Sequence, residues 1–233
     1  VKAKPMEDFG HNLDEFLKLI SEKTKLIFIA NPNNPTGNLI EKSKISAFLS
    51  KVPKHILVVL DEAYDEYLRD EDKSIAFNWL AEYKNLLISR SFSKAHCLAG
   101  LRIGYGAGNK EVINLMNRVR QPFNVNSIAQ AAAIASLEDD EFINRSRLIN
   151  DQGRLQLEEV FNELKIEYIP SYGNFISFNL EDETKAMMYY QHLLKNGVIV
   201  RPIQNYEMPS WLRVSIGLKE ENSTFIKYLK SFS

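Results

Sequence analysis

Short apolar runs alternate with helical patterns through the first half of the chain. Strands are predicted at four of these runs, LIFIA (26–30), HILVVL (55–60), NLLISRSF (85–92) and LRIGYGAG (101–108). Between the first two, apolar residues from Ile45 to Val52 recur at i, i+3, i+4 and i+7, which is the spacing of an amphipathic helix. Strand, helix and strand at this spacing predict a largely parallel α/β sheet. Runs this apolar are typical of a sheet that helices cover on both faces.

The second half of the chain has a different order of elements. From Ser127 to about Leu164 the pattern is mostly helical, and a further helix is predicted near residues 183–195. Strand patterns lie in IEYIP, GNFISFNL, VIVRPI and WLRVSIG, and the chain ends on an amphipathic helix, NSTFIKYLKSF. This order predicts a large α/β domain at residues 1–140 and a smaller α+β domain at 141–233, with the boundary inside the long helix.

Charge and composition narrow the classes of partner. With 29 basic and 30 acidic residues the formal net charge is −1, which favours neither nucleic acid nor an anionic membrane surface. No apolar run approaches the length that spans a bilayer. Cys97 is the only cysteine, which is consistent with a reducing compartment. The four histidines are scattered, so we expect no metal site. The glycines of Gly104–Gly108 have the wrong spacing for a dinucleotide-binding loop.

Polar residues follow three of the predicted strands, at the point where each strand ends. Asn34 lies past the first, Asp61 directly follows the second and Lys94 closes the third. Ligands bind outside the carboxyl ends of the strands in an open α/β sheet, so we expect the amide, the acid and the lysine to meet in one pocket. Desolvation there makes the lysine lose its proton more easily, and a neutral amine can form a Schiff base with an aldehyde.

Five motifs together resemble the pyridoxal-phosphate aminotransferases of fold type I, and most closely the histidinol-phosphate aminotransferases. They are NPNNPTG (31–37), DEAYDEY (61–67), SRSFSKAHCLAGLRIGYG (89–106), RQPFNVNSIAQAA (120–132), and VRPI with WLRVSIG (200–217). The resemblance extends over nearly the whole chain. It implies a cytoplasmic homodimer of histidine biosynthesis that uses pyridoxal 5′-phosphate. Histidinol phosphate and 2-oxoglutarate would give imidazole acetol phosphate and glutamate.

The resemblance also implies a role for each residue that would hold the cofactor. Lys94 would bind it covalently and then move protons, and Asp61 would pair with the pyridinium nitrogen. Asn34 and Tyr64 would donate hydrogen bonds to its phenolic oxygen. The residues that would contact the cofactor phosphate are Ser91, Ser93 and Arg102.

Three further residues would bind the substrates. The resemblance implies that Arg213 binds the α-carboxylate of glutamate and that Arg201 binds the phosphate of the larger substrate, because an arginine fork suits both groups. Asn174, in GNFISF, would line the same pocket.

Structural alternatives stay open for the same residues. Asp61 alone fits a turn or a helix cap, and Asn34 fits the tight turn of NPNNPTG. Tyr64 fits core packing and Ser91 fits a turn cap. Lys94, Arg201 and Arg213 taken singly fit an ordinary surface.

Other functions also stay open. Enzyme alternatives are an aromatic amino-acid aminotransferase and a related pyridoxal-phosphate decarboxylase. Non-enzyme alternatives are a regulatory cofactor-binding protein and an inactive truncated chain. Members of the resembled family carry a glycine-containing turn for the cofactor phosphate and a tyrosine that reaches the partner subunit. Nothing between Val1 and Lys25 replaces them, so we expect a sequence that begins partway through a longer protein, with an incomplete large domain.

Overall fold

The computed structural model describes residue 2 and residues 4–232, and it divides the chain into two compact units. The first unit comprises the residues up to Asn33 together with Leu39–Asn144. The second comprises Asn34–Asn38 together with the residues from Arg145 onward. The short loop Asn34–Asn38 thus belongs with the C-terminal residues although it lies early in the sequence.

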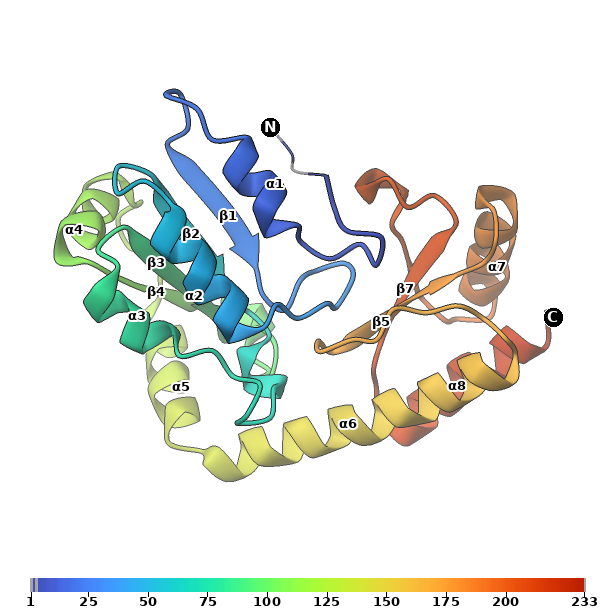
Figure 1. Cartoon of the computed structure of the whole chain (residues 1–233). Coiled ribbons are helices and arrows are strands. Elements are labelled where there is room, and N and C mark those ends of the chain that lie inside the picture. Colours follow the sequence, from blue (N-terminus) through green and yellow to red (C-terminus); the bar gives the residue numbers. More distant parts are fainter. Residues whose placement is uncertain (1, 3, 233) are drawn as a thin grey trace. The chain divides into compact units, whose positions relative to one another are not determined.

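A four-stranded sheet forms the centre of the first unit (Figure 1). Its strands, in spatial order, are β1 (Leu26–Ala30), β2 (Leu57–Asp61), β3 (Leu86–Ser91) and β4 (Gly104–Gly108). The first three are parallel, and β4 pairs antiparallel with β3. The predicted α/β class with a largely parallel sheet is confirmed, and all four predicted strands are present.

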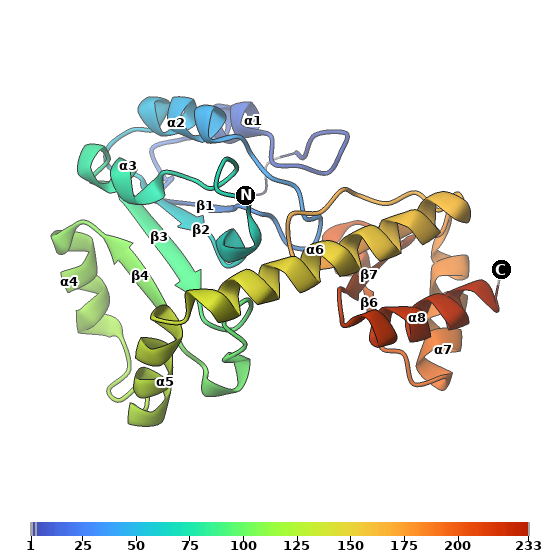
Figure 2. The ribbon, with the colours of Figure 1, turned by 90° about the horizontal axis from the view of Figure 1, so that it is seen from below.

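Helices in the first unit alternate with the strands. They are α1 (Leu13–Lys18), α2 (Lys42–Lys51), α3 (Ala76–Glu82), α4 (Lys110–Val119) and α5 (Ser127–Leu137), with short 3₁₀ helices η1 (Asp65–Tyr67) and η2 (Ala99–Leu101). Figure 2 shows α1, α2 and α3 on one face of the sheet. Ile45, Phe48 and Leu49 of α2 are buried there against the inward side chains of β1–β3, which confirms the predicted amphipathic helix. Each such burial stabilises the fold by about 1.5–3 kcal/mol.

The second face of the sheet is covered less completely within the described residues. Ile113 and Met116 of α4 approach β4. On β1, however, Leu26 and Phe28 are 52% and 65% exposed. Successive side chains of a strand point to opposite faces, and on β1 the inward residues Ile27 and Ile29 are buried. Within the described residues, the outward set of β1 is therefore much more exposed than the inward set.

The second unit is a three-stranded antiparallel sheet packed with helices. Its strands are β5 (Phe175–Asn179), β6 (Arg201–Pro202) and β7 (Trp211–Ser215), in the order β5-β7-β6. Its helices are α7 (Glu183–Lys195), α8 (Lys219–Lys230) and the 3₁₀ helix η3 (Gln204–Tyr206). Helix α6 (Asp140–Glu163) begins in the first unit and continues into the second. The predicted smaller α+β part is confirmed.

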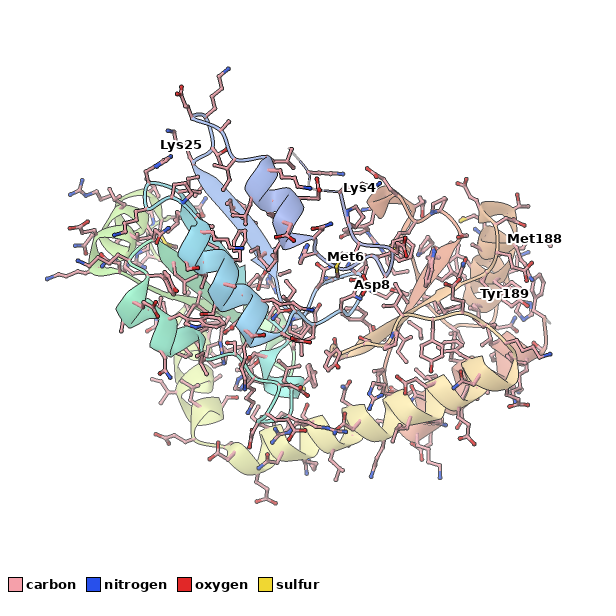
Figure 3. All side chains as sticks on the ribbon, viewed as in Figure 1. Lys4, Met6, Asp8, Lys25, Met188 and Tyr189 are labelled. Atoms are coloured by element: carbon pink, nitrogen blue, oxygen red, sulfur yellow. The ribbon has the colours of Figure 1, made fainter. Side chains whose placement is uncertain are left out.

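Aromatic side chains form the core of the second unit. Phe161 stacks on Phe178 with ring centroids 5.0 Å apart, and Phe225 packs against both rings. Tyr189 and Met188, both labelled in Figure 3, show how α7 divides its faces: Tyr189 is buried and Met188 is 53% exposed.

Side-chain caps fix where several helices begin. Asn126 accepts a hydrogen bond from the Ala129 N–H at 2.8 Å and starts α5, and Asp182 accepts one from Lys185 at 2.8 Å and starts α7. Such caps satisfy backbone donors that have no partner inside the helix. Across residue 2 and residues 4–232, no helix combines the length and apolar character needed to cross a bilayer.

Candidate active site

Asp61 and Lys94 come from the carboxyl ends of adjacent parallel strands in the first unit. Asp61 is the last residue of β2, in register with Ala30 of β1 and Ser89 of β3. Lys94 follows shortly after β3, which ends at Ser91. Because β2 and β3 are parallel, both residues lie at the same edge of the sheet, where open α/β sheets bind their ligands.

The ring of Tyr64 lies beside the amine of Lys94. The Lys94 Nζ is 5.4 Å from the Tyr64 ring centroid, within the range of a cation–π contact. Tyr64 is only 5% exposed and Lys94 is half-buried. A half-buried amine against an aromatic face differs from the solvated surface lysine that Lys94 alone would suggest.

The carboxylate of Asp61 is held in a turn and remains open to solvent. One of its oxygens accepts a hydrogen bond from the Ala63 N–H at 3.2 Å, and the residue is exposed. The turn interaction is the one expected of an aspartate after a strand. It fixes the carboxylate at the sheet edge, three residues before Tyr64.

Because β3 pairs with β4, the segments that carry Ser91, Ser93 and Arg102 lie next to each other at the end of β3. The Phe92 N–H donates to the Ile103 carbonyl at 3.2 Å, just past the pair Ser91 and Gly104. The Ser91 hydroxyl accepts from the Ser93 N–H at 3.0 Å, so the predicted turn cap is present.

Arg102 stands in the same segment with a left-handed backbone (φ 53°), and its Nη1 donates to the Ala99 carbonyl at 2.9 Å. Hydroxyls and a guanidinium form the kind of donor set that binds a phosphate.

A buried ionic cluster lies behind the turn that carries Asp61 and Tyr64. Arg90 of β3 contacts Glu62 at 2.7 Å, Asp65 at 2.8 Å and Glu66 at 3.6 Å, and all four side chains are at most 13% exposed. The sequence motifs predict no role for these four residues. The available signal was the spacing of three acids at i, i+3 and i+4 in DEAYDEY, beside an arginine in a strand.

Burial governs the ionisation of the groups around this cluster. It raises the pKa of Glu66, and the neighbouring carboxylates raise it further, while Arg90 lowers it. Burial lowers the pKa of His96. The His96 Nδ1 lies 2.7 Å from the Ser136 hydroxyl, and its Nε2 lies 3.9 Å from Glu66.

Asn34 and Arg213 are hydrogen-bonded to each other in the second unit, with Nη1 of Arg213 donating to Oδ1 of Asn34. The loop that carries Asn34 is held to the same unit by the Ser177 hydroxyl, which donates to the Pro35 carbonyl at 2.6 Å. Asn34 thus belongs to the unit that holds Arg213. Its meeting with Asp61 and Lys94 in one pocket stays a prediction.

Arg201 and Arg213 line one cavity of about 600 Å³ in the second unit. They are direct partners across the antiparallel pair β6 and β7, and Cζ of Arg213 lies 4.9 Å from the Phe175 ring centroid. Like charges directly opposite each other destabilise a sheet, and an anion between them would relieve the repulsion. The cavity therefore has the charge of an anion-binding site.

Asn174 is not among the described residues that line this cavity. Its carbonyl accepts from the Ile216 N–H at 2.9 Å, past the end of β7, whereas Arg213 lies within the strand. That Asn174 lines the substrate pocket stays a prediction. Over the described part of the chain, no group of three or more histidine, cysteine, aspartate or glutamate side chains is arranged to hold a metal ion.

A mostly parallel α/β unit with a lysine and a carboxylate at one sheet edge, followed by a small α+β unit, is an arrangement typical of aminotransferases. The sequence profile of the family "Aminotransferase class I and II" matches residues 1–228. The chain belongs to this family.

Individual relatives give a finer comparison. The chain is 60% identical to histidinol-phosphate aminotransferase of Methylobacillus flagellatus over 226 residues, which cover 97% of this chain and 60% of that protein. It is 50% identical to histidinol-phosphate aminotransferase 2 of Ralstonia nicotianae over 228 residues, covering 97% of this chain and 61% of that protein. The chain thus spans about three fifths of the length of these relatives.

Solved structures agree with this placement. The crystal structure of histidinol-phosphate aminotransferase from Sinorhizobium meliloti in complex with pyridoxal-5′-phosphate matches with a TM-score of 0.92 at 25% identity. The match covers 100% of this chain and 65% of that chain.

Proposed function

We propose that the chain is part of a histidinol-phosphate aminotransferase, which moves the amino group of histidinol phosphate to 2-oxoglutarate with pyridoxal 5′-phosphate as cofactor. The observation that carries the proposal is the 60% identity to the Methylobacillus flagellatus protein over 226 residues. The products are imidazole acetol phosphate and glutamate. The family membership supports the reaction class, and the identity supports this particular amino donor.

The residues at the sheet edge of the first unit suit pyridoxal phosphate by their chemistry. A half-buried amine, Lys94, suits the aldehyde, and an open carboxylate, Asp61, suits the ring nitrogen. Tyr64, buried beside the amine, is proposed to hydrogen-bond the phenolic oxygen. Asn34 is proposed as a further partner of that oxygen, on the strength of the NPNNPTG resemblance.

The cofactor phosphate is proposed to bind at the end of β3. The residues assigned to it are Ser91, Ser93 and Arg102. Their hydroxyls and guanidinium supply several donors, and a guanidinium can bind two phosphate oxygens at once.

When bound, the cofactor supplies an aldehyde for covalent capture of amines and a ring that accepts electron density from the substrate carbon. The chain supplies the proton chemistry. Lys94 would take the proton from the substrate Cα and later return one. Asp61 holds a proton on the ring nitrogen, and that charge favours electron withdrawal.

The two arginines of the second unit are proposed to bind the anionic groups of the substrates. Arg213 is assigned to the α-carboxylate of glutamate and 2-oxoglutarate, and Arg201 to the phosphate of histidinol phosphate. Their shared cavity of about 600 Å³ supports both assignments, because two guanidinium groups that face each other across β6 and β7 line it. Asn174 is kept as a proposed substrate contact on the resemblance alone.

We also propose a cytoplasmic homodimer. A single cysteine is consistent with a reducing compartment. Family resemblance supports the dimer, and sedimentation equilibrium at several protein concentrations would test it, with a concentration-independent monomer mass counting against it.

The experiment for the proposed function compares amino donors. The protein is loaded with pyridoxal phosphate, reduced with borohydride and mapped by mass spectrometry, and the modified peptide is expected to contain Lys94. Unreduced protein is then given histidinol phosphate or phenylalanine with 2-oxoglutarate. Turnover of histidinol phosphate far above that of phenylalanine is expected. The reverse order would favour an aromatic amino-acid aminotransferase, and release of carbon dioxide would favour a decarboxylase.

A further inference from the structure

One guanidinium joins the turn after β2 to the strand that leads to Lys94. Nε and Nη2 of Arg90 both donate to one oxygen of Glu62, at 3.0 and 2.7 Å, and Nη2 also lies 2.8 Å from Asp65. Glu62 directly follows Asp61, and Asp65 directly follows Tyr64. Arg90 therefore contacts the residue that directly follows Asp61 and the residue that directly follows Tyr64, the two residues proposed to contact the cofactor.

The other oxygen of Glu62 accepts a hydrogen bond from the Ser74 hydroxyl. The guanidinium also lies over the Phe77 ring, with Cζ 5.1 Å from the centroid. These contacts fix both ends of the Arg90–Glu62 pair, so the pair has little freedom to shift without moving the turn.

The same cluster reaches the loop that carries Lys94 from a second direction. His96, two residues after Lys94, is buried, and its Nε2 lies 3.9 Å from Glu66. Its ring packs on Phe92 at 4.8 Å between centroids, and its Nδ1 lies 2.7 Å from the Ser136 hydroxyl. Arg90, before Lys94, thus contacts the turn directly, and His96, after Lys94, lies close to Glu66 of the same turn.

The positive charge of Arg90 balances part of the negative charge of the buried acids around it. A single guanidinium faces three buried acids, Glu62, Asp65 and Glu66. Without the cation these acids would repel one another and draw in water, and the turn between them would move. The three acids that Arg90 contacts alternate with Asp61 and Tyr64 in one short segment. A movement of the acids would therefore also move Asp61 and Tyr64.

We propose that Arg90 is a positioning residue, whose guanidinium holds the Asp61–Tyr67 turn in the place where the Tyr64 ring covers the Lys94 amine. The inference rests on the proposed function for its catalytic meaning, because it concerns the geometry of the proposed lysine and carboxylate. Arg90 is not itself expected to touch the cofactor or the substrates.

The test measures the exposure of the Lys94 amine in cofactor-free protein. Wild type and Arg90→Gln are treated with trace acetic anhydride, and acetylation of each lysine is quantified by mass spectrometry with isotope-coded reagent. Lys110, exposed on α4, serves as the internal reference. In Arg90→Gln the ratio of Lys94 to Lys110 labelling is expected to rise about threefold or more, because loosening of the turn exposes the amine.

Two further variants make the result specific. Arg69→Gln removes one positive charge from an exposed site at the end of the same segment, and its labelling ratio is expected to match wild type. Arg90→Lys keeps the charge but loses the two-pronged contact with Glu62, and its ratio is expected to rise. Circular dichroism identifies folded samples. If Arg90→Gln does not fold, Arg90→Lys decides the question by the same criterion.

A wild-type labelling ratio in folded Arg90→Gln would overturn the proposal, as would an equal rise at Lys110, since that would be general loosening. A separate arm reduces pyridoxal phosphate onto the wild-type protein with borohydride. Absence of an adduct at Lys94 in that arm would count against the proposed function while leaving the labelling result valid. An adduct together with unchanged labelling in the variants would remove the positioning role alone.

Discussion

The amine of Lys94 and the ring of Tyr64 face each other at the carboxyl edge of the first sheet, with 5.4 Å between Nζ and the ring centroid. The two residues come from different loops, after β3 and after β2. Their contact brings the proposed covalent anchor of the cofactor beside a residue proposed to bind its phenolic oxygen.

Lys94→Ala is expected to abolish covalent capture of the cofactor and to reduce transamination by about four orders of magnitude or more, because no other group replaces the lost nucleophile and proton carrier. Borohydride reduction followed by intact-mass measurement checks the first effect. Lys110→Ala is the control and is expected to retain the adduct. An adduct of unchanged yield in Lys94→Ala would assign the anchor to another lysine.

Asp61→Asn is expected to reduce the turnover number by about two to three orders of magnitude with a modest loss of cofactor affinity. The amide keeps the size of the side chain and can still accept from the Ala63 N–H, but it cannot hold a proton on the ring nitrogen. Steady-state kinetics and equilibrium dialysis of the cofactor separate the two effects. A turnover number near that of wild type would contradict the proposed role.

Arg201→Gln and Arg213→Gln are expected to separate the two substrates. Loss of Arg201 should raise KM for histidinol phosphate about tenfold to a hundredfold and leave KM for 2-oxoglutarate nearly unchanged, since a charge-assisted contact to one phosphate is removed. Loss of Arg213 should raise KM for 2-oxoglutarate. Equal effects of Arg201→Gln on both substrates would show that the cavity does not divide the anions as proposed.

Gly37→Ala is expected to destabilise the protein by about 2–4 kcal/mol, measured by urea unfolding. Gly37 has φ +84°, and an added Cβ would lie 2.6 Å from the Ser171 Cβ. Gly197→Ala is the matched control, because Gly197 has φ +78° but open space around it. It is expected to cost about 1 kcal/mol from backbone strain alone. Equal losses in the two variants would show that the close approach to Ser171 adds nothing.

Glu66→Gln is expected to gain stability relative to wild type as pH rises from about 4.5. Burial raises the pKa of Glu66 in the folded protein, so the folded state binds a proton that the unfolded state has already lost in that window. Wild type therefore loses stability as pH rises through the folded pKa, whereas glutamine does not titrate. Urea unfolding from pH 4 to 8 checks this, with the exposed Glu71→Gln as control. A constant difference across that range would contradict it.

Local patterns predicted the elements of both units closely. Apolar runs marked β1 to β4, and the period of the apolar residues in α2 marked which side of that helix meets the core. These features depend on a few residues that are neighbours in the sequence, so they can be predicted without knowledge of the tertiary packing. The relation between Asp61 and Lys94 followed from the same source, because parallel strands have their carboxyl ends at one edge.

Such local patterns do not predict contacts between residues that are far apart in the sequence. The apolar run NLLISRSF predicts a strand that contains Arg90, but not that its guanidinium lies among three acids. The apolar run LIFIA predicts a strand with helices on both faces, whereas Phe28 is 65% exposed within the described residues. The packing of separate elements sets both the register of strand pairing and the burial of each face of the sheet. Neither can be predicted from one segment of the sequence.

The sequence by itself determined the order of strands and helices, the family, and the residue types gathered at the strand ends, because periodicity and strand termination are local properties. Only the tertiary structure decided that Asn34 joins Arg213 in the C-terminal unit and that Arg90 ties the Tyr64 turn to the Lys94 loop. Both facts depend on hydrogen bonds and ion pairs between residues far apart in the chain, which form only when the elements pack.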